Sequence, residues 1–535
     1  MMKSAIVLAL ATASVFFGLS ALPAPAQGLD PKKLVQPPTD TWPTYNGDYS
    51  GRRFSTLDKV NASNIGELKL AWVYGASTGE PAATGPFSAL TIKSTPILVN
   101  GVLYFTAPDH VWAVDARGGR ELWHYAWKSK GGIHIGNRGV GIYENWLYFE
   151  TPDCHLVSLN LKDGKERWNK EICDLDQQYY ASVAPIVVKN HILVGVSGDD
   201  LDIPGYLDAR DPETGDLQWR FNIEPKKGEP GFESWPNAEA AAHGGGMTWI
   251  PGTYDPQLNL YYVGTGNPQP VLAGKGREGD NLYTESIVAI NPDTGKLAWY
   301  YQPSPHDTHD WDAVQTPILI DGEYQGRQRH LIAQASRNGY FFLLDRATGE
   351  HLLTTPYSKT NWSKGLNAKG QPMRDLAKDP APDGALVSPG SSGSTNWPPP
   401  SFSPQTGLLY VSTSRSYSVF YLTDLDEKPE GWAGGDQTVW SKSMVTAIDY
   451  KTGKVRWEHP WLTGGGLSGL LSTAGGLLFC GDPSGNFIAL DPATGKPLWH
   501  AGLHTNTSNG PMTYELDGVQ YVVVGAGDSL YAFSR

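Results

Sequence analysis

Three segments of the chain carry closely spaced carboxyl and amide side chains. These are Asn267, which follows the apolar stretch Leu258 to Val263, the pair Asp310 and Asp312, and the adjacent Asp199 and Asp200. Amide and carboxylate oxygens are the ligands that hard cations such as calcium prefer. A carboxylate held near a cation can also accept a proton during catalysis. Taken alone, each segment also fits an ordinary polar turn, so the chemistry depends on the elements that bring the segments together.

A repeated phrase indicates what those elements are. It consists of an apolar strand, an Asp or Asn, a turn with Gly, and a Trp eight positions after the Asp or Asn. The copies are Asp115 to Trp123, Asn160 to Trp168, Asp211 to Trp219, Asn291 to Trp299, Asp449 to Trp457 and Asp491 to Trp499, with a degenerate copy at Asp345 to Leu353. The Asp or Asn side chain closes the turn, and Gly adopts a backbone conformation that other residues avoid. Regularly spaced indoles that pack between neighbouring sheets predict a β-propeller.

Composition supports one large all-β body. The 535 residues include 61 Gly, 40 Pro and 19 Trp, which suits many short strands joined by tight turns. The segment Tyr357 to Asn396, rich in Pro, Gly, Ser and Lys, is predicted to be a long loop over one face. The last strands, within Tyr521 to Ser534, are expected to pair with early strands and close the ring, because a propeller has its only open seam between its ends.

The N-terminus has the pattern of a secretory signal peptide. Lys3 precedes the apolar stretch Ala5 to Leu22, and Ala24-Pro25-Ala26 fits a cleavage site. Residues 1–26 are therefore predicted to be removed, with an uncleaved membrane anchor as the alternative. No other apolar run is long enough to span a bilayer. We expect residues 27–535 to form a single domain in the periplasm, without stable membrane insertion.

Charge and cysteine content narrow the possible partners. The formal net charge is -13 and has no long run of either sign, which argues against a nucleic-acid partner. No C-x-x-C-H haem-attachment motif occurs, so an electron acceptor of haem type must be a separate protein. The three cysteines are Cys154, Cys173 and Cys480. Cys154 and Cys173 either pair in an oxidising compartment or remain isolated thiols, and the sequence does not decide between the two.

The repeated phrase, together with Thr41-Trp42-Pro43-Thr44-Tyr45-Asn46-Gly47-Asp48, resembles the methanol and ethanol dehydrogenases that depend on pyrroloquinoline quinone (PQQ). The resemblance covers nearly the whole mature chain. It implies an eight-bladed β-propeller with tryptophan-docking motifs, which binds PQQ and one metal ion. It also implies oxidation of an alcohol to an aldehyde or ketone, with hydride transfer to metal-bound PQQ and electrons passed to a separate cytochrome c.

The resemblance assigns the acidic segments to the metal and the base. Asn267 corresponds to a metal ligand, and Asp310 corresponds to both a ligand and the general base. Asp312 stands where relatives that use lanthanides have a second Asp, and a trivalent ion calls for additional carboxylate oxygens. Lanthanide(III) and Ca²⁺ both remain open. Relatives have Glu where Asp200 falls, and since Asp is one methylene shorter, Asp199 is the alternative ligand.

Further residues are assigned to PQQ by the same resemblance. Trp249 would stack beneath the planar quinone, Arg138 would pair with a PQQ carboxylate through its bidentate guanidinium, and Arg337 would lie near the quinone carbonyls. The remaining expected contacts are Ser182, Ser197, Asn396, Trp397 and Lys93, the last of which replaces a Glu of relatives.

One departure concerns the roof of the pocket. Many relatives cover PQQ with a disulfide between adjacent cysteines, but those positions here are Gly132 and Ile133. A differently covered pocket favours an alcohol larger than methanol. The competing hypothesis is a non-catalytic propeller scaffold of the cell envelope, which would have no reason to hold Asn267, Asp310, Trp249 and Arg337 together.

Overall fold

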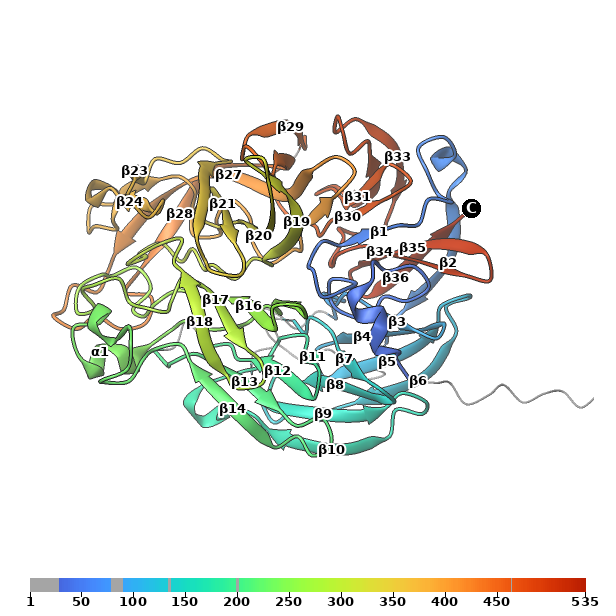
Figure 1. Ribbon diagram of the computed structural model, residues 1–535, viewed down its shortest axis with the longest axis horizontal. Helices are drawn as coiled ribbons and strands as arrows, with labels where there is room; N and C mark the ends of the chain where they lie inside the picture. The colour runs from blue at the N-terminus through green and yellow to red at the C-terminus, as the bar shows by residue number, and fades with distance from the viewer. Residues whose placement is uncertain (1–27, 78–89, 133–135, 199–201, 463) are drawn as a thin grey trace, which may run out of the picture.

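The computed structural model describes residues 28–77, 90–132, 136–198, 202–462 and 464–535. Nearly all regular structure in these ranges is β-strand, which confirms the predicted all-β class. The sheets stand side by side around a common centre and form a β-propeller (Figure 1). The predicted signal peptide, residues 1–26, lies outside the described residues.

Most sheets are antiparallel and use four strands that follow one another along the chain. The first three are β3 (Ile97–Val99), β4 (Val102–Ala107), β5 (His110–Asp115) and β6 (Glu121–Ala126); β7 (Gly141–Tyr143), β8 (Trp146–Glu150), β9 (His155–Asn160) and β10 (Glu166–Glu171); and β11 (Ile186–Val188), β12 (His191–Gly195), β13 (Tyr206–Arg210) and β14 (Leu217–Asn222). The next two are β15 (Thr253–Asp255), β16 (Leu260–Gly264), β17 (Ile287–Asn291) and β18 (Lys296–Tyr301); and β19 (Ile318–Tyr324), β20 (Arg327–Ala335), β21 (Tyr340–Asp345) and β22 (His351–Pro356).

The following two sheets each have an added strand. One contains β25 (Ala385–Val387), β27 (Leu408–Leu422), β28 (Gly434–Asp449) and β29 (Val455–Pro460), with β26 (Ser401–Ser403) paired to β27. The other contains β30 (Leu471–Thr473), β31 (Leu477–Gly481), β32 (Asn486–Leu490) and β33 (Pro497–Gly502), with β1 (Phe54–Ser55) parallel to β30.

The two ends of the chain share one sheet. β2 (Lys69–Gly75) pairs antiparallel with β36 (Ser529–Ser534), which continues into β35 (Val519–Ala526) and β34 (Met512–Leu516). Figure 1 shows this sheet, with strands from the blue and red ends of the chain, between its first and last neighbours in the ring. The predicted closure by the last strands is therefore confirmed, and it removes the open sheet edges that would otherwise invite aggregation.

The repeated phrase forms its turns as expected. In all seven copies the Asp or Asn Oδ1 accepts the backbone N–H two residues later, at 2.7–3.1 Å. The turn glycines, such as Gly295 and Gly495, have φ of +67° and +71°, in the left-handed region.

The indoles connect neighbouring sheets. The Nε1 of one Trp donates to the carbonyl that follows the Asp or Asn of the next copy, and the ring packs on that copy's turn glycine. The bonds are Trp72 to Ala116, Trp123 to Leu161, Trp219 to Pro292, Trp299 to Arg346 and Trp457 to Pro492, at 2.7–3.2 Å. At Trp168 the same carbonyl, of Pro212, accepts from the Tyr148 hydroxyl instead, at 2.9 Å. Five of these Trp residues thus satisfy their polar N–H while burying a large apolar ring, whereas Nε1 of Trp168 is buried without a hydrogen-bond partner among the described residues.

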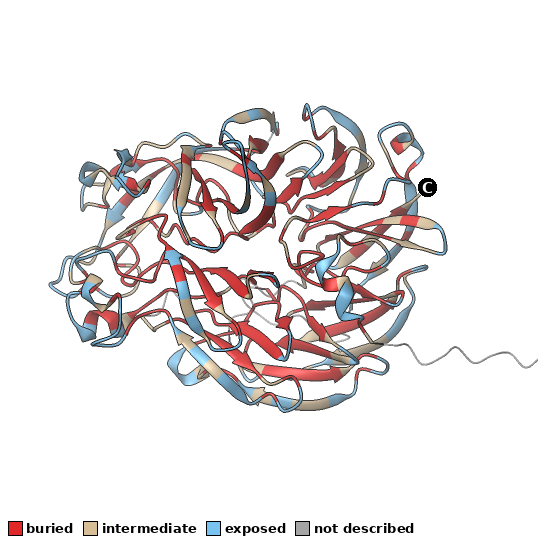
Figure 2. Ribbon diagram, viewed as in Figure 1, coloured by how far each residue is buried: buried red, intermediate tan, exposed pale blue. Residues whose placement is uncertain are grey.

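Burial follows the radial position of a strand. The inner strands β12 and β16 are buried at every residue, whereas the outer strand β14 alternates between exposed and partly buried side chains. Figure 2 shows this gradient from buried strands near the centre to exposed strands at the rim. The core therefore lies between the sheets, where each inner strand is covered on both faces.

We expect Gly495→Ala to lower the free energy of unfolding by about 3 kcal/mol, from about 1 kcal/mol of left-handed strain and about 2 kcal/mol of overpacking. A Cβ there would lie 2.5 Å from the Trp457 ring at φ +71°. Gly518→Ala is the matched control, because φ is +83° but nothing lies within 4 Å of its Cβ. Urea unfolding of both variants measures the difference, and equal losses would contradict a role for Gly495 in docking Trp457.

The segment between Tyr357 and Asn396 is not one uninterrupted loop. It contains a small two-stranded sheet, β23 (Ser363–Leu366) and β24 (Pro372–Arg374), the short 3-10 helix η5 (Leu376–Lys378), and β25. The prediction was wrong in missing these elements, because short strands that pair with one another outside the repeats carry no periodic signal.

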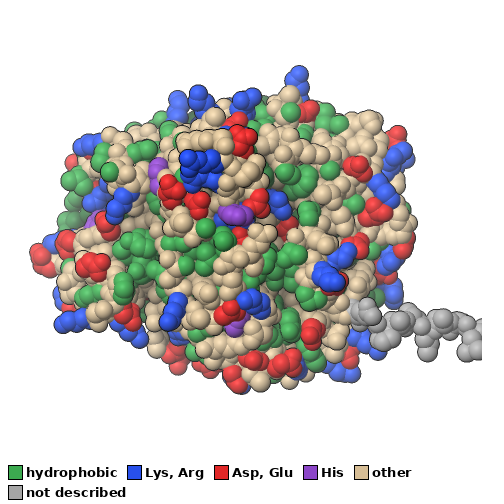
Figure 3. Space-filling model, viewed as in Figure 1, with side chains coloured by type: hydrophobic (Ala, Val, Ile, Leu, Met, Phe, Trp, Pro, Cys, Tyr) green, Lys and Arg blue, Asp and Glu red, His purple; other side chains and the backbone are tan. Residues whose placement is uncertain are grey.

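Among the residues that the structure describes, helical elements are few and short. They are α1 (Ala238–His243) and the 3-10 helices η1 (Pro31–Val35), η2 (Ile65–Glu67), η3 (Leu175–Gln177), η4 (Phe232–Ser234) and η5. Within the described ranges, no helix combines the length and the apolar character needed to cross a bilayer. On the face seen in Figure 3, acidic and basic side chains are interspersed.

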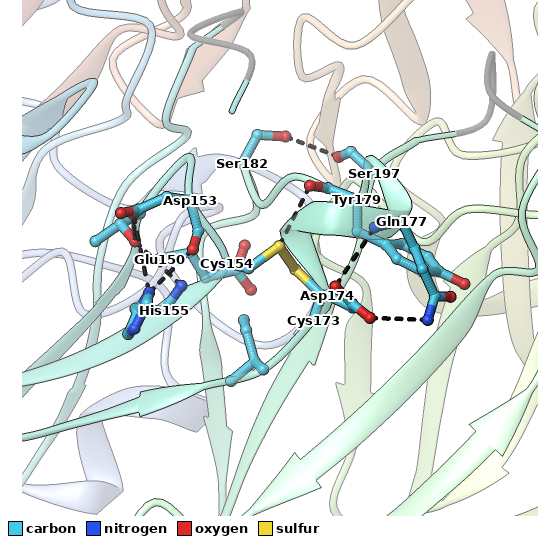
Figure 4. Close-up of a disulfide and its surroundings, with 12 residues drawn as sticks. Glu150, Asp153, Cys154, His155, Cys173, Asp174, Gln177, Tyr179, Ser182 and Ser197 are labelled. Carbon is cyan, nitrogen blue, oxygen red and sulfur yellow. Dashed lines mark hydrogen bonds and ion pairs between the residues drawn. A yellow bond between two sulfur atoms is a disulfide. The ribbon is translucent and has the colours of Figure 1, made fainter. Parts of the chain in front are cut away.

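The cysteine alternative left open by the sequence is resolved. Cys154 and Cys173 form a disulfide that joins the turn just before β9 to the segment after β10, and Cys480 is a buried free thiol. Figure 4 shows the disulfide beside Tyr179, whose carbonyl lies 3.3 Å from the Cys154 sulfur, and near the Ser182–Ser197 hydroxyl pair.

Candidate cofactor and metal site

The segment after β16, the residues before β17 and the acidic segment at Asp310 meet as neighbouring backbones. Thr265 N donates to Ser286 O at 2.9 Å, and Ala313 N donates to Thr265 O at 3.0 Å. On the other side, Gly246 N donates to Asn267 O at 2.8 Å, which brings in the glycine-rich segment before Trp249. Residues far apart in the sequence are thereby placed next to one another at the ends of strands.

Asp312 binds three of the predicted site residues at once. Its Oδ1 accepts the Asn267 backbone N–H at 2.7 Å, and its Oδ2 accepts the Trp249 indole N–H at 3.2 Å. The same Oδ2 also accepts from Nη1 of Arg337. Asp312 is 1% exposed, so these buried contacts fix the position of its carboxylate.

Arg337 joins the two acids of the predicted metal site. Its Nη2 donates to Asp310 Oδ2 at 2.8 Å and to the Ser391 carbonyl at 2.7 Å, while Nη1 binds Asp312. The side chain of Asp310 is 15% exposed and that of Asp312 only 2% exposed. Asp310 is thus the acid of this pair that a substrate can more readily reach.

The charges in this group do not balance. Burial alone would lower the pKa of Arg337, but the negative charges of Asp310, Asp312 and Glu285 outweigh it and raise that pKa. Burial raises the pKa of Asp312, and Arg337 opposes the rise. The buried carboxylate of Asp312 and the partly buried carboxylate of Asp310 share one guanidinium, so the group carries an excess of negative charge that a cation would neutralise.

The donor set fits a hard cation. The Asn267 side chain is fully buried, and its Oδ1 has no hydrogen-bond partner among the described residues. With Asp310 and Asp312, it offers the oxygen ligands that calcium and trivalent ions accept. Asp199 and Asp200 lie outside the described residues. In the part of the chain that is described, no three His, Cys, Asp or Glu side chains form a metal-binding group.

Glu285 is a site residue that the sequence reasoning missed. Its side chain is fully buried, and its backbone N–H donates to Gly266 O at 2.8 Å, next to Asn267. Burial raises the pKa of Glu285 well above its ordinary value, and the charges of Asp307 and Asp312 raise it further. The available signal was an acidic residue two positions before the apolar strand Ile287–Asn291.

Trp249 lies under Arg138. The Arg138 guanidinium carbon is 4.7 Å from the centre of the Trp249 ring and 5.7 Å from that of Trp397, as in cation–π contacts. Arg138 Nη1 donates to the Ser182 hydroxyl at 2.7 Å. A planar quinone that lies on Trp249 would replace the guanidinium on this face, and Arg138 would then reach its carboxylates from the edge.

The other predicted cofactor residues divide into two groups. Ser182 and Ser197 are buried, and their hydroxyl oxygens lie 3.1 Å apart. Burial lowers the pKa of Lys93 to about 8, and the nearby positive charge of Arg138 adds to this shift. The side chains of Lys93 and Arg138 therefore place two cations close together. Asn396 instead bonds within its own loop, to Ser392 O at 3.1 Å and from Trp397 N at 2.8 Å.

The roof position Gly132 cannot hold a larger residue without rearrangement. A Cβ at Gly132 would lie 2.0 Å from the Pro152 carbonyl oxygen, and φ is +88°. The backbone here therefore excludes the cysteine that relatives carry at this position. Ile133, the second position of the cysteine pair in relatives, lies outside the described residues.

Comparisons with known proteins agree with this arrangement. Residues 42–381 match the model of the glucose/ethanol/alcohol dehydrogenase β-propeller domain, and residues 441–535 match that of outer membrane protein assembly factor BamB. The chain is 34% identical to the quinohemoprotein alcohol dehydrogenase of Comamonas testosteroni, over 91% of this chain and 73% of that protein. It is 33% identical to the quinoprotein alcohol dehydrogenase PedH of Pseudomonas putida, over 89% of this chain and 84% of that protein.

Among solved structures, a europium-containing methanol dehydrogenase superposes with a TM-score of 0.82 at 28% identity, covering 94% of this chain and 99% of that one.

Proposed function

The chain belongs to the PQQ-dependent alcohol dehydrogenase family, and on that premise we propose that it oxidises an alcohol larger than methanol in the periplasm and passes the electrons to a separate cytochrome c. It is a PQQ-dependent alcohol oxidoreductase with a β-propeller fold. We further propose that each sheet of four or five strands is one blade, eight in all, within a single domain spanning residues 27–535.

The observation that carries the proposal is the convergence of Asp310 and Asp312 on Arg337, beside the buried and unsatisfied amide oxygen of Asn267. A scaffold has no need to bury this unbalanced charge. The match to the BamB model is confined to residues 441–535, whereas the alcohol dehydrogenase relatives align over about nine-tenths of the chain. Both facts favour the enzyme over the scaffold.

When bound, PQQ supplies a quinone that accepts two electrons from the alcohol. The chain supplies position and proton transfer. Asp310 accepts the hydroxyl proton of the alcohol, and Arg337 holds Asp310 at 2.8 Å and provides positive charge where oxygen becomes negative. Trp249 provides the flat apolar floor, and Arg138 with Lys93 provides cations for the cofactor's carboxylates.

Asn267, Asp310 and Asp312, together with Asp200 or Asp199, would hold the metal. We propose a lanthanide(III) ion as the metal, with Ca²⁺ as the alternative, because the described part of the site already holds an excess of buried acids. The similarity to a europium-containing methanol dehydrogenase supports this choice.

The proposal is tested by reconstitution. The purified mature protein, mixed with PQQ and either LaCl₃ or CaCl₂, should oxidise primary and secondary alcohols with an artificial electron acceptor. We expect ethanol and longer alcohols to react at least as well as methanol. A protein that binds no PQQ by absorbance would contradict the assignment, and a panel in which only methanol reacts would contradict the proposed substrate size. A basic cytochrome c from the same periplasm should then replace the artificial acceptor.

A further inference from the structure

Glu285 lies inside the candidate site, and the proposed reaction gives it no role. Its side chain is 0% exposed, and across the described ranges neither carboxyl oxygen has a hydrogen-bond partner. Buried carboxyl groups in proteins are ordinarily paired, because an unpaired one loses its hydration without compensation. The Glu285 carboxyl group is thus not occupied by another group of the described chain, and unlike the equally unpaired Glu224 it lies close enough to Asp312 and Arg337 for their charges to act on its pKa.

The backbone of Glu285 pairs with Gly266, the residue before the predicted metal ligand Asn267. Glu285 N donates to Gly266 O at 2.8 Å. Gly266 in turn packs on Asp312, since a Cβ built on Gly266 would lie 2.9 Å from Asp312 Oδ1. That same Oδ1 accepts the Asn267 N–H at 2.7 Å. The Glu285 backbone is thus bonded to the residue that precedes Asn267 and packs on Asp312.

Glu285 also acts on the charges of the site. It is one of the three acids that raise the pKa of Arg337, the others being Asp310 and Asp312. With Glu285 ionised, three carboxylates would face one shared guanidinium, and a cation close by favours the ionised form. The negative charge of Glu285 would attract a cation in the site. It would attract a trivalent ion more strongly than a divalent one, because the attraction is proportional to the ionic charge.

We propose that Glu285 is a further acidic residue of the metal site and that its charge makes the site prefer a trivalent cation over a divalent one. This inference rests on the proposed function, because it requires that the site hold a metal ion. It assigns Glu285 the role of a specificity-determining residue that acts through its negative charge.

The test compares two ions on one isosteric variant. The mature protein and Glu285→Gln are freed of metal, saturated with PQQ and titrated with LaCl₃ or CaCl₂ by calorimetry. Because Coulomb energy scales with ionic charge, the binding free energy that the variant loses for La³⁺ and the one that it loses for Ca²⁺ should have a ratio of about three to two. A variant that binds Ca²⁺ about 100-fold more weakly should therefore bind La³⁺ about 1000-fold more weakly. Glu285→Asp keeps the charge and should recover most of the La³⁺ affinity.

Glu224→Gln is the matched control. Glu224 is 5% exposed, neither of its oxygens has a partner among the described residues, and burial raises its pKa, but no charge of the site contributes to that shift. The Glu224→Gln variant should bind La³⁺ and Ca²⁺ with affinities within about twofold of the wild-type values. Equal losses for the two ions in Glu285→Gln, or no loss, would overturn the proposal. A wild-type protein that binds PQQ but neither ion would contradict the proposed metal dependence itself, and the role of Glu285 with it.

Discussion

Asp310→Asn is expected to lower kcat for alcohol oxidation by about 1000-fold, within the range usual for loss of a general base. The Asp310 side chain is 15% exposed, whereas that of Asp312 is 2% exposed and is already occupied by three donors. Asp310 is therefore the carboxylate that an incoming alcohol can reach. Asn fits the backbone, because φ at Asp310 is +63° and Asn tolerates that region better than most residues.

The measurement is turnover of the PQQ-loaded and metal-loaded variant, together with its PQQ absorbance and metal content. Asp307→Asn provides a control in the same segment. Asp307 accepts the backbone N–H groups of His309 and Trp311 at 3.0 and 3.2 Å, which an Asn oxygen can also accept. Its kcat should stay within a few-fold of wild type. Full turnover by Asp310→Asn with normal PQQ and metal loading would show that another group is the base.

Much of the fold was predictable because its repeating unit has a local signature. The Asp or Asn, the turn glycine and the Trp each have a short-range role that the sequence spacing reveals, and their contacts to the next sheet follow from repetition. Strands β23 and β24 had no such signature, since their pairing depends on one another alone. Leu353 stands where other copies have Trp, yet β21 and β22 still pair in the same register pattern.

The site residues were predictable where short sequence segments match those of a known family. This holds for Asn267, Asp310, Asp312 and Arg337, and the structure brings these four residues together. Two features depend on three-dimensional packing and could not be predicted. Arg138 stacks on Trp249 because two distant segments meet, and Glu285 lies near enough to raise the pKa of Arg337 because its backbone pairs with Gly266. A single buried acid looks in sequence like any turn residue before a strand.

Asp312→Asn is expected to abolish activation by lanthanides, with La³⁺-dependent kcat/KM at least 100-fold below wild type, while the fold is retained. Asn keeps an oxygen that can accept the Asn267 N–H, now 2.7 Å from Asp312 Oδ1, but it removes one negative charge. That charge matters most for a trivalent ion, because the attraction grows with ionic charge. Both variants lose Oδ2, the acceptor of Trp249 and Arg337, because the Asn NH2 group can only donate; Asp312→Ala loses the acceptor of the Asn267 N–H as well. Losing one partner of a buried ion pair costs about 3–5 kcal/mol.

Comparison of the two variants separates the loss of charge, which both share, from the loss of the hydrogen bond to the Asn267 N–H, which occurs only in Asp312→Ala. Thermal unfolding of the metal-free proteins should show a clearly lower Tm for Asp312→Ala and a smaller change for Asp312→Asn. Kinetics with LaCl₃ and CaCl₂ should show the loss of La³⁺ activation in both, with Ca²⁺-dependent turnover reduced less in Asp312→Asn. If Asp312→Asn is activated by La³⁺ as strongly as the wild-type protein, then Asp312 serves only to position Arg337 and Trp249, and the preference for a trivalent ion must come from elsewhere in the site.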